Sequence, residues 1–238
     1  MKMQNHPLII PKSSESGYTL LEGLMAVIVV SVVLVGIGPV VAFSVGTRVQ
    51  AKRVELATQA GRTYIDGVKS GSIPIDINSG ATKIESVIYS QTNDKPEKFT
   101  VTVTAPKIGS FTCEPTSANP YCTVGGKTLY CVDFDGDNQC SSSSVVDMMV
   151  QPFRSALSTA DDFRKSYLLG IRVYRANSFA DEVGQQYNTS QLDTTLPATT
   201  VTNALGDRRK PLVKMTTEVV PSTSNFNDLQ KRLEKTSP

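Results

Sequence analysis

The sequence predicts an α+β protein in which one long N-terminal helix packs against an antiparallel β-sheet. Three observations lead to this prediction. Residues 24–45 form a run of 22 residues without a charge. Residues 49–68 place apolar side chains at helical spacing, and several later segments alternate between apolar and polar residues. The first pattern needs an apolar environment, the second gives a helix with one packing face, and the third is typical of strands with one buried face.

The uncharged run is long enough to cross a membrane. At about 1.5 Å per residue it spans roughly 33 Å, whereas the hydrocarbon core is about 30 Å thick. A buried core helix is one alternative, but only Ser31, Ser44 and glycines interrupt the apolar surface here. A secretory signal peptide is another, but its apolar region has about 7–15 residues and precedes its small-residue cleavage site. We therefore predict a transmembrane helix.

The segments on either side of the run bear on processing and orientation. Residues 1–17 are polar and mildly basic, and their two prolines disfavour a helix, so we expect a leader that is removed. Arg48, Lys52 and Arg53 follow the run, so the lysine and arginine bias does not favour an N-terminus inside. An even number of cysteines in the C-terminal part instead indicates an oxidising space for that domain.

The apolar run follows directly on the residues Gly17-Tyr18-Thr19-Leu20-Leu21-Glu22. These residues resemble the N-terminal signature of type IV pilins and pseudopilins. The family pattern is a glycine, an aromatic residue, threonine, leucine, any residue and glutamate, and tyrosine stands here in place of the usual phenylalanine. Pro39 stands at the spacing where the family often carries a proline within the helix.

The resemblance implies a processing and assembly pathway. A prepilin peptidase would cut between Gly17 and Tyr18 on the cytoplasmic side and methylate the new amine of Tyr18. The chain would then consist of a leader (1–17), a transmembrane helix (18–45) and an extracytoplasmic pilin-like domain (46–238). Anchored in the plasma membrane by a single pass with its N-terminus cytoplasmic, the subunit would wait for a pilus assembly platform and pack against other pilin or pseudopilin subunits.

Glu22 lies where the apolar run begins, and a carboxylate near hydrocarbon is costly. After cleavage, its best partner in the apolar core of a fibre would be the amine of Tyr18 in a neighbouring subunit. Breaking one half of such a buried pair costs roughly 3–5 kcal/mol, so the pair would set the subunit register. The alternative is a carboxylate that reaches the headgroups.

Gly36, Gly38 and Pro39 form a weak point in the predicted membrane helix. Proline removes a backbone hydrogen bond and clashes with the preceding turn. The resemblance implies local unwinding here during fibre assembly. The alternative is the ordinary tolerance of membrane helices for glycine and proline.

Three segments carry a narrower resemblance: "RVQAKRVELATQAGRTYIDGVKSG" (48–71), "YCVDFDGDNQCSSS" (130–143) and "YLLGIRVYRA" (167–176). They resemble the pseudopilins of cyanobacterial hormogonium polysaccharide secretion. This resemblance implies a role in a pilus-like machine for polysaccharide export and gliding motility.

The helix is expected to continue to about Lys69, where Gly71 and Pro74 end it. Period-two patterns then predict strands over 98–105, 128–134, 145–151, 166–176 and 211–220. Residues 188–203 are threonine-rich and predict an exposed loop. The segment 225–235 predicts a short helix with Phe226, Leu229 and Leu233 directed inward.

The cysteines are evenly spaced, nine residues apart: Cys113, Cys122, Cys131 and Cys140. Four cysteines allow three disulfide pairings, and the spacing does not choose among them. Sequential pairs would close two small loops, each worth about 2–3 kcal/mol. A zinc site is the alternative, although the short C-x-x-C knuckle is missing.

Aspartates alternate in the loop between the last two cysteines: Asp133, Asp135 and Asp137. Oxygen ligands at every second position suit Ca²⁺, and some pseudopilins hold a calcium loop. The match to an EF-hand loop is partial, because Asn138 replaces the expected glycine and Ser144 the expected glutamate. Asp147 offers a late ligand. A solvated acidic turn is the alternative to this calcium site.

Composition argues against two classes of function. A net charge of +2, 7% aromatic residues and no run rich in lysine or arginine do not predict nucleic-acid binding. The single histidine, His6, lies in the expected leader, so no Ser–His or Cys–His pair is available, and we do not expect an enzyme. Two competing hypotheses from different functional classes are a single-span anchored adhesion or ligand-binding domain and a single-span anchored enzyme.

Overall fold

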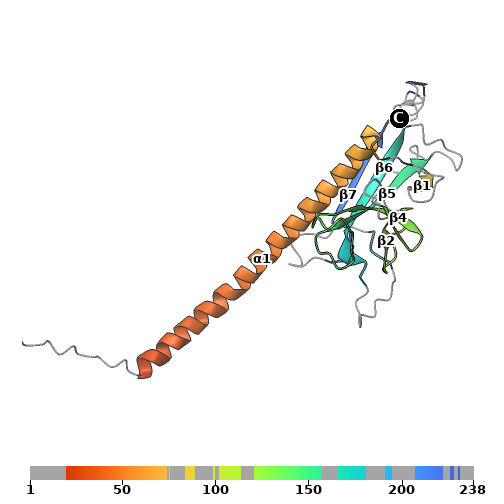
Figure 1. Cartoon of the computed structure of the whole chain (residues 1–238). Coiled ribbons are helices and arrows are strands. Elements are labelled where there is room, and N and C mark those ends of the chain that lie inside the picture. Colours follow the sequence, from red (N-terminus) through yellow and green to blue (C-terminus); the bar gives the residue numbers. More distant parts are fainter. Residues whose placement is uncertain are drawn as a thin grey trace, which may run out of the picture. The chain divides into compact units, whose positions relative to one another are not determined.

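The computed structural model divides into two compact units, Met1–Val45 and Gly46–Pro238, which are described separately below (Figure 1). It describes residues 20–73, 75, 84–88, 99, 102–113, 121–156, 166–180, 191–194, 207–221, 226–227 and 230.

The first element is the helix α1, Leu20–Ser70, which confirms the predicted long N-terminal helix. It ends where Gly71 adopts a left-handed conformation with φ 76°. The backbone amides of Gly71 and Ile73 then donate to the carbonyls of Val68 and Gly67, at 3.2 and 3.0 Å. A glycine just after the last turn permits this reversal because it has no Cβ to clash.

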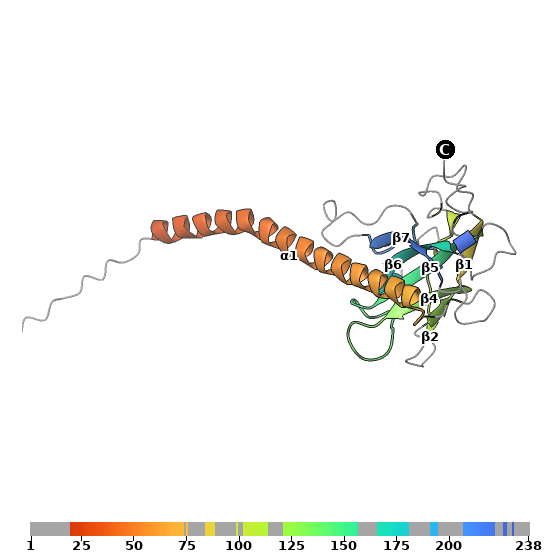
Figure 2. The ribbon, with the colours of Figure 1, turned by 90° about the horizontal axis from the view of Figure 1, so that it is seen from above.

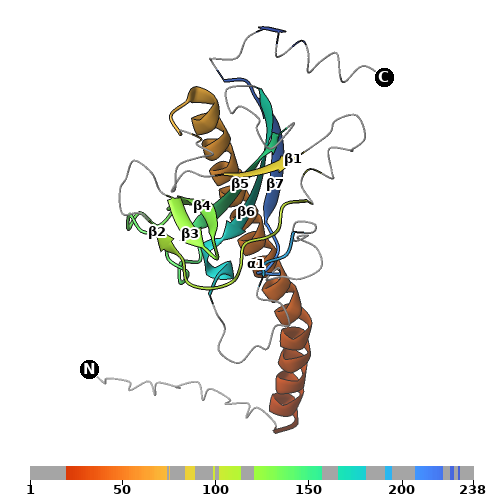
Figure 3. The same ribbon diagram turned by 90° about the vertical axis from the view of Figure 1, so that its right-hand side faces the viewer.

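The second unit holds a seven-stranded sheet. Its elements are β1 (Glu85–Ile88), β2 (Thr112–Cys113), β3 (Tyr121–Val124), β4 (Lys127–Val132), β5 (Met148–Ala156), β6 (Tyr167–Arg175), the short 3-10 helix η2 (Ala176–Ser178) and β7 (Val213–Val219). The order is β2-β3-β4-β5-β6-β7 with antiparallel neighbours, and β1 pairs in parallel with β5 (Figure 3). The predicted α+β class is confirmed.

One proline explains how two strands share an edge of β5. The pairing of β4 ends at Val150, and the pairing of β1 begins at Phe153. Pro152 lies between these two positions, while on its other side it stands opposite Ile171 of β6. Proline has no amide hydrogen to donate to a neighbouring strand. A central strand therefore tolerates it at the position where pairing with β4 has ended and pairing with β1 has not begun.

The second half of α1 packs across one face of the sheet (Figure 2). Ala57, Ala60 and Tyr64 are fully buried in one cluster with Ile171 and Val173 of β6. The approach is close, since a Cβ on Gly61 would lie 3.0 Å from Ile171 Cδ1. The small side chains therefore let helix and sheet meet, and the expected packing half of the helix is confirmed.

The opposite face of the sheet is also covered, which the alternating pattern of β6 did not predict. Arg172 is fully buried there and donates to Gln151 Oε1 at 2.9 Å and to the carbonyl of Val103 at 2.5 Å. Gln151 in turn donates to the carbonyl of Thr104 at 2.9 Å. A polar side chain in β6 thus anchors a covering segment instead of facing water.

The strand predicted over residues 98–105 was wrong, because the described residues of this region form the covering segment instead. Within 98–105, the described residues are 99 and 102–105, and none of them is in a strand. Phe99 and Val103 instead cluster with Phe153 and Val87. In this segment the apolar side chains pack on a sheet face, and the carbonyls of Val103 and Thr104 accept hydrogen bonds from Arg172 and Gln151. The alternation of valine and threonine therefore does not reflect a strand.

The structure describes parts of two further predicted segments, the helix over 225–235 and the exposed loop over 188–203. Phe226 is 76% exposed, so its inward placement was wrong, and Leu229 and Leu233 lie outside the described residues. Of the predicted loop 188–203, only 191–194 is described. Leu192 is buried there in the cluster that covers the second sheet face, so the loop is not wholly exposed.

Candidate functional site

The apolar half of α1 is exposed along its whole length. Every residue of 20–45 is exposed, including Val33 at 49% and Leu20 at 88%. One 18-residue window reaches a mean hydropathy of 2.8 with none of it buried in the protein. By length and composition the helix is able to cross a membrane, and an N-terminal segment of this kind serves as an anchor or as a signal sequence.

Glu22 lies in the first turn of α1. A carboxylate at this end of a helix interacts favourably with the helix dipole, which gives it a local role as well. Gly17 and Tyr18 lie outside the described residues, so the predicted cleavage, the N-methylation and the pairing of Tyr18 with Glu22 remain predictions.

Pro39 lies inside α1, as the sequence predicted. It has no amide to donate to the carbonyl of Val35, one turn earlier. A Cβ added to Gly36 or Gly38 would meet no atom within 4 Å. Glycine is therefore not required by packing in this unit, which agrees with a role in helix flexibility or in close contact with another helix.

Both disulfides join sequential cysteines, Cys113 to Cys122 and Cys131 to Cys140. Cys113 and Cys122 stand opposite each other in β2 and β3, so the first bond crosses an antiparallel pair. The second closes the loop that follows β4. The structure thus selects one of three possible pairings, and no thiolate remains among these cysteines for the alternative zinc site.

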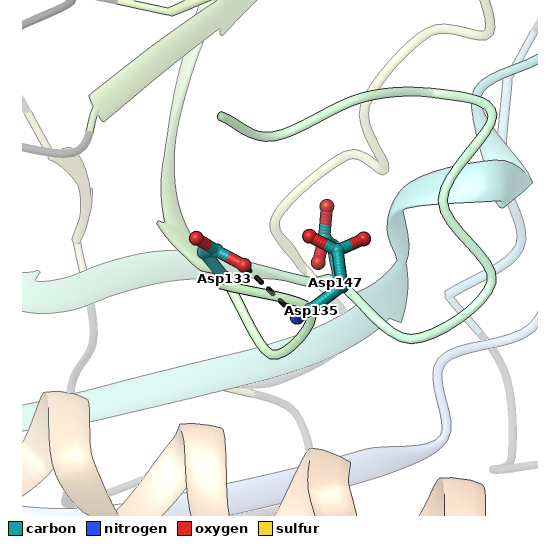
Figure 4. Close-up of side chains that lie close together, drawn as sticks. All are labelled: Asp133, Asp135 and Asp147. Carbon is teal, nitrogen blue, oxygen red and sulfur yellow. Dashed lines mark hydrogen bonds between the residues drawn. The ribbon is translucent and has the colours of Figure 1, made fainter. Parts of the chain in front are cut away.

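The acidic loop brings together two of the three predicted aspartates and Asp147, the late ligand that the sequence offered. Oxygen atoms of Asp133, Asp135 and Asp147 lie within 4.8 Å of one another (Figure 4). Asp137 is not in this group, and its Oδ1 accepts a hydrogen bond from the backbone of Gln139 at 2.8 Å. Val132 of β4 pairs with Met148 of β5, so the neighbouring residues Asp133 and Asp147 lie side by side. Asp147 therefore occupies the place in the group that was predicted for Asp137.

Asp133 organises the turn. Its Oδ1 accepts from the backbone amides of Asp135 and Gly136 at 3.0 and 2.7 Å, and its Oδ2 accepts from Asn138 at 2.8 Å. Burial acts to raise the pKa of Asp133, but the hydrogen bonds from Gly136, Asn138 and Asp135 outweigh it and lower that pKa. Gly136 and Asn138 adopt positive φ values of 80° and 61°, as a tight turn requires.

Asp147 is fully buried. It accepts hydrogen bonds from the backbone amides of Phe134 at 3.2 Å and Ser141 at 3.5 Å. Burial raises its pKa, and the neighbouring charge of Asp135 adds to this, while the hydrogen bonds oppose it only in part. Ser144 Oγ donates to Asp135 Oδ2 at 2.9 Å and so fixes the second carboxylate.

The donor set fits Ca²⁺ in chemistry and in size. All three groups offer carboxylate oxygens, and two oxygens that ligate one Ca²⁺ at 2.3–2.6 Å lie at most about 5 Å apart. Asp133 Oδ1 already accepts two amides, whereas its Oδ2 accepts one and keeps a second lone pair for a cation. The loop differs from an EF-hand because its third carboxylate comes from Asp147, the residue directly before β5, rather than from a glutamate at the twelfth position.

Comparison of the chain with protein-family models, curated proteins and solved structures finds no match. The class of architecture therefore rests on the structure itself. A long N-terminal apolar helix continues into a half that packs on a largely antiparallel sheet, and the domain carries two disulfides. This architecture is pilin-like.

Proposed function

We propose that the chain is a membrane-anchored pseudopilin or minor pilin that acts by assembly rather than by catalysis. The observation that carries this proposal is the division of one continuous helix. Residues 20–45 are apolar and exposed on all sides, whereas the rest of α1 buries one face on the sheet. A subunit that must leave a membrane and enter a helical fibre needs an apolar helix that fits both environments.

In this proposal a prepilin peptidase removes residues 1–17 and methylates the amine of Tyr18. The apolar segment then holds the subunit in the plasma membrane with its domain outside the cytoplasm, in the oxidising space where the two disulfides form. An assembly platform extracts the subunit, and its helix packs against those of other pilin or pseudopilin subunits.

Glu22 sets the register in this assembly. Among the described residues of the apolar half it is the sole charged side chain. Inside a bundle of such helices its carboxylate finds a complementary charge only at the amine of Tyr18 in a neighbouring subunit. Leaving that carboxylate unpaired costs about 3–5 kcal/mol, which disfavours a misplaced subunit.

The narrower resemblance supports a specific machine. The segments 48–71, 130–143 and 167–176 correspond to the packed half of α1, the acidic loop and β6. We infer from these segments that the fibre serves polysaccharide export and gliding motility. The acidic loop adds a structural Ca²⁺ site in this proposal, in which Asp133, Asp135 and Asp147 tie the loop after β4 to the start of β5.

The experiment that tests this function is mass analysis of the N-terminal peptide from protein purified out of its native membrane. We expect a peptide that begins at N-methylated Tyr18. An intact leader that begins at Met1 in the mature pool would overturn the proposal and favour an ordinary single-span anchor for an adhesion or ligand-binding domain.

A matched pair of variants tests assembly. Glu22→Ala should be processed and retained in the membrane but incorporated into fibres at least tenfold less than the wild type, because the partner amine is left unpaired. The control is Glu55→Ala, which removes an exposed carboxylate of the packed half of α1 that pairs with Lys52. Normal incorporation of Glu22→Ala would rule out the register role.

A further inference from the structure

Basic side chains gather in the second unit where α1, η2 and the segment before β7 meet. The three segments 46–55, 175–178 and 207–210 carry two carboxylates, Glu55 and Asp207. Against these stand seven basic side chains, which we call the basic rim: Arg48, Lys52, Arg53, Arg175, Arg208, Arg209 and Lys210.

Hydrogen bonds hold these segments together. The guanidinium of Arg208 donates to the carbonyl of Asn177 in η2. The amide of Leu212 donates to the carbonyl of Val173 at 2.8 Å, which fixes the segment before β7 against β6. Figure 3 shows the start of β7 beside α1. The backbone segments that carry the basic rim are therefore fixed relative to one another within the folded domain.

The like charges of the rim act on one another. Arg175 is 3% exposed, and burial, followed by the charges of Arg53 and Arg208, lowers its pKa to about 10 although Asp207 opposes this. Gln50, on the same turns of α1, is 1% exposed, and neither polar atom of its side chain has a hydrogen-bond partner. The repulsion among these guanidinium groups costs stability, and a bound anion would offset it.

The position of the basic rim along the chain indicates which anions lie within its reach. Arg48 follows Val45 by three residues and Arg53 follows it by eight, which is about 5–12 Å along a helix. The headgroup layer extends about 5–8 Å beyond each side of the hydrocarbon core. A helix whose apolar segment spans the bilayer therefore places Arg48 at the level of the lipid phosphates. Arg53 lies beyond that layer, and its long side chain reaches back toward it.

We propose that the basic rim binds anionic phospholipid headgroups at the membrane surface and so holds the domain against the bilayer before assembly. This inference rests on the proposed function only in taking residues 20–45 as a membrane span. Each engaged basic side chain favours an anionic over a neutral lipid about fivefold, and the preference falls with ionic strength.

The test uses the full chain in vesicles of phosphatidylcholine with phosphatidylglycerol. Because the chain contains no tryptophan, Phe43→Trp introduces a single fluorescent donor two residues before the end of the apolar run. Energy transfer from this donor to dansyl-labelled phosphatidylglycerol, compared with dansyl-labelled phosphatidylcholine, measures local enrichment of the anionic lipid. Lipids brominated on their acyl chains quench the donor only if the segment is inserted, which tests the membrane span separately.

We expect several-fold enrichment of the anionic probe that disappears at high salt. In the same background, Arg48→Gln/Lys52→Gln should reduce it about fivefold or more, and Arg208→Gln/Lys210→Gln should reduce it as well. The matched control is Arg62→Gln/Lys69→Gln, which removes the same charges from exposed positions farther along α1 and should leave the enrichment unchanged.

The outcomes separate this inference from the proposed function. A donor that the brominated lipids do not quench would overturn the membrane span itself. A quenched donor with equal transfer to both probes would overturn the rim alone. An equal loss in the Arg62→Gln/Lys69→Gln control, or full competition by millimolar glycerol phosphate, would also overturn it, because the first indicates a general charge effect and the second a soluble phosphate site.

Discussion

The two halves of α1 belong to one helix, but only one of them is buried against the rest of the chain. In residues 20–45 every side chain is exposed, although nearly all are apolar. In residues 46–70 one face is buried: Gln50, Ala57, Ala60, Gly61, Tyr64 and Val68. Both halves belong to one helix, so the difference lies in the distribution of apolar side chains around it.

This comparison indicates what each half requires from its surroundings. A stripe of small and apolar residues needs one protein surface, and the sheet provides it. A helix that is apolar on all sides needs an apolar environment on all sides, such as hydrocarbon or a bundle of like helices. One sequence therefore encodes a folded domain and a segment that the domain does not cover.

The largest expected effect comes from removing the main contact of the packed half. Tyr64 is fully buried, its ring lies 5.0 Å from that of Tyr130, and its hydroxyl is 3.4 Å from that of Tyr121. We expect Tyr64→Ala to lower the free energy of unfolding by about 3–5 kcal/mol. Urea unfolding of the full chain in detergent micelles, followed by near-UV circular dichroism, measures this change.

The control for that variant is Phe43→Ala, which truncates an aromatic residue that is 56% exposed in the apolar half. It should leave the unfolding midpoint of the domain unchanged. Equal shifts in the two variants would contradict the division of α1 into a packed and an uncovered half.

A slightly smaller effect is expected from a charge in the middle of the apolar half. Val33→Arg places a guanidinium near the centre of the run, where it disfavours membrane insertion by about 2.5–3.5 kcal/mol. We expect carbonate extraction to release a larger share of this variant than of the wild type. Val49→Arg, beyond the run, should stay with the membrane fraction. Equal release of Val33→Arg and the wild type would count against hydrocarbon around this segment.

The sequence predicted those elements whose signals are local. The long helix follows from an uncharged run and a continuing helical stripe, and β4, β6 and β7 follow from alternation within 128–134, 166–176 and 211–220. The class of the fold follows from their order along the chain. Each of these signals is contained in the segment that forms the element.

What the sequence did not reveal depends on contacts between distant segments. Alternation in β6 predicted one solvent-facing side, but the segment around Val103 covers that side and accepts a hydrogen bond from Arg172. The sequence offered Asp147 as a late ligand, but it did not show that the pairing of β4 with β5 places Asp147 rather than Asp137 beside Asp133 and Asp135. The basic rim is another case, since Arg175 and Arg208 lie far from Arg53 along the chain. Sequence spacing does not report such meetings.

The smallest expected effect concerns the acidic loop, and it compares the free carboxylates with the calcium-bound ones. We expect Ca²⁺ at ten times its Kd to stabilise the oxidised full chain by about 1.4 kcal/mol, and EGTA to reverse this. Asp147→Asn should abolish the calcium-dependent shift in Tm, because it removes the carboxylate that joins the loop to β5. Asp137→Asn is the control and should keep the shift, because Asp137 lies outside the group.

The pH dependence of the calcium-free protein has a definite sign at Asp147. Its raised pKa means that the folded state binds this proton more tightly than the unfolded state. The contribution is present below the unfolded pKa of about 3.9 and is lost as pH rises through the higher folded pKa. Asp133 has a lowered pKa, so its contribution runs in the opposite direction and is lost as pH falls. Asparagine does not titrate, so Asp147→Asn should remove the fall in Tm that occurs as pH rises through the folded pKa of Asp147. If the variant keeps the same dependence of Tm on pH as the wild type, Asp147 does not cause that fall.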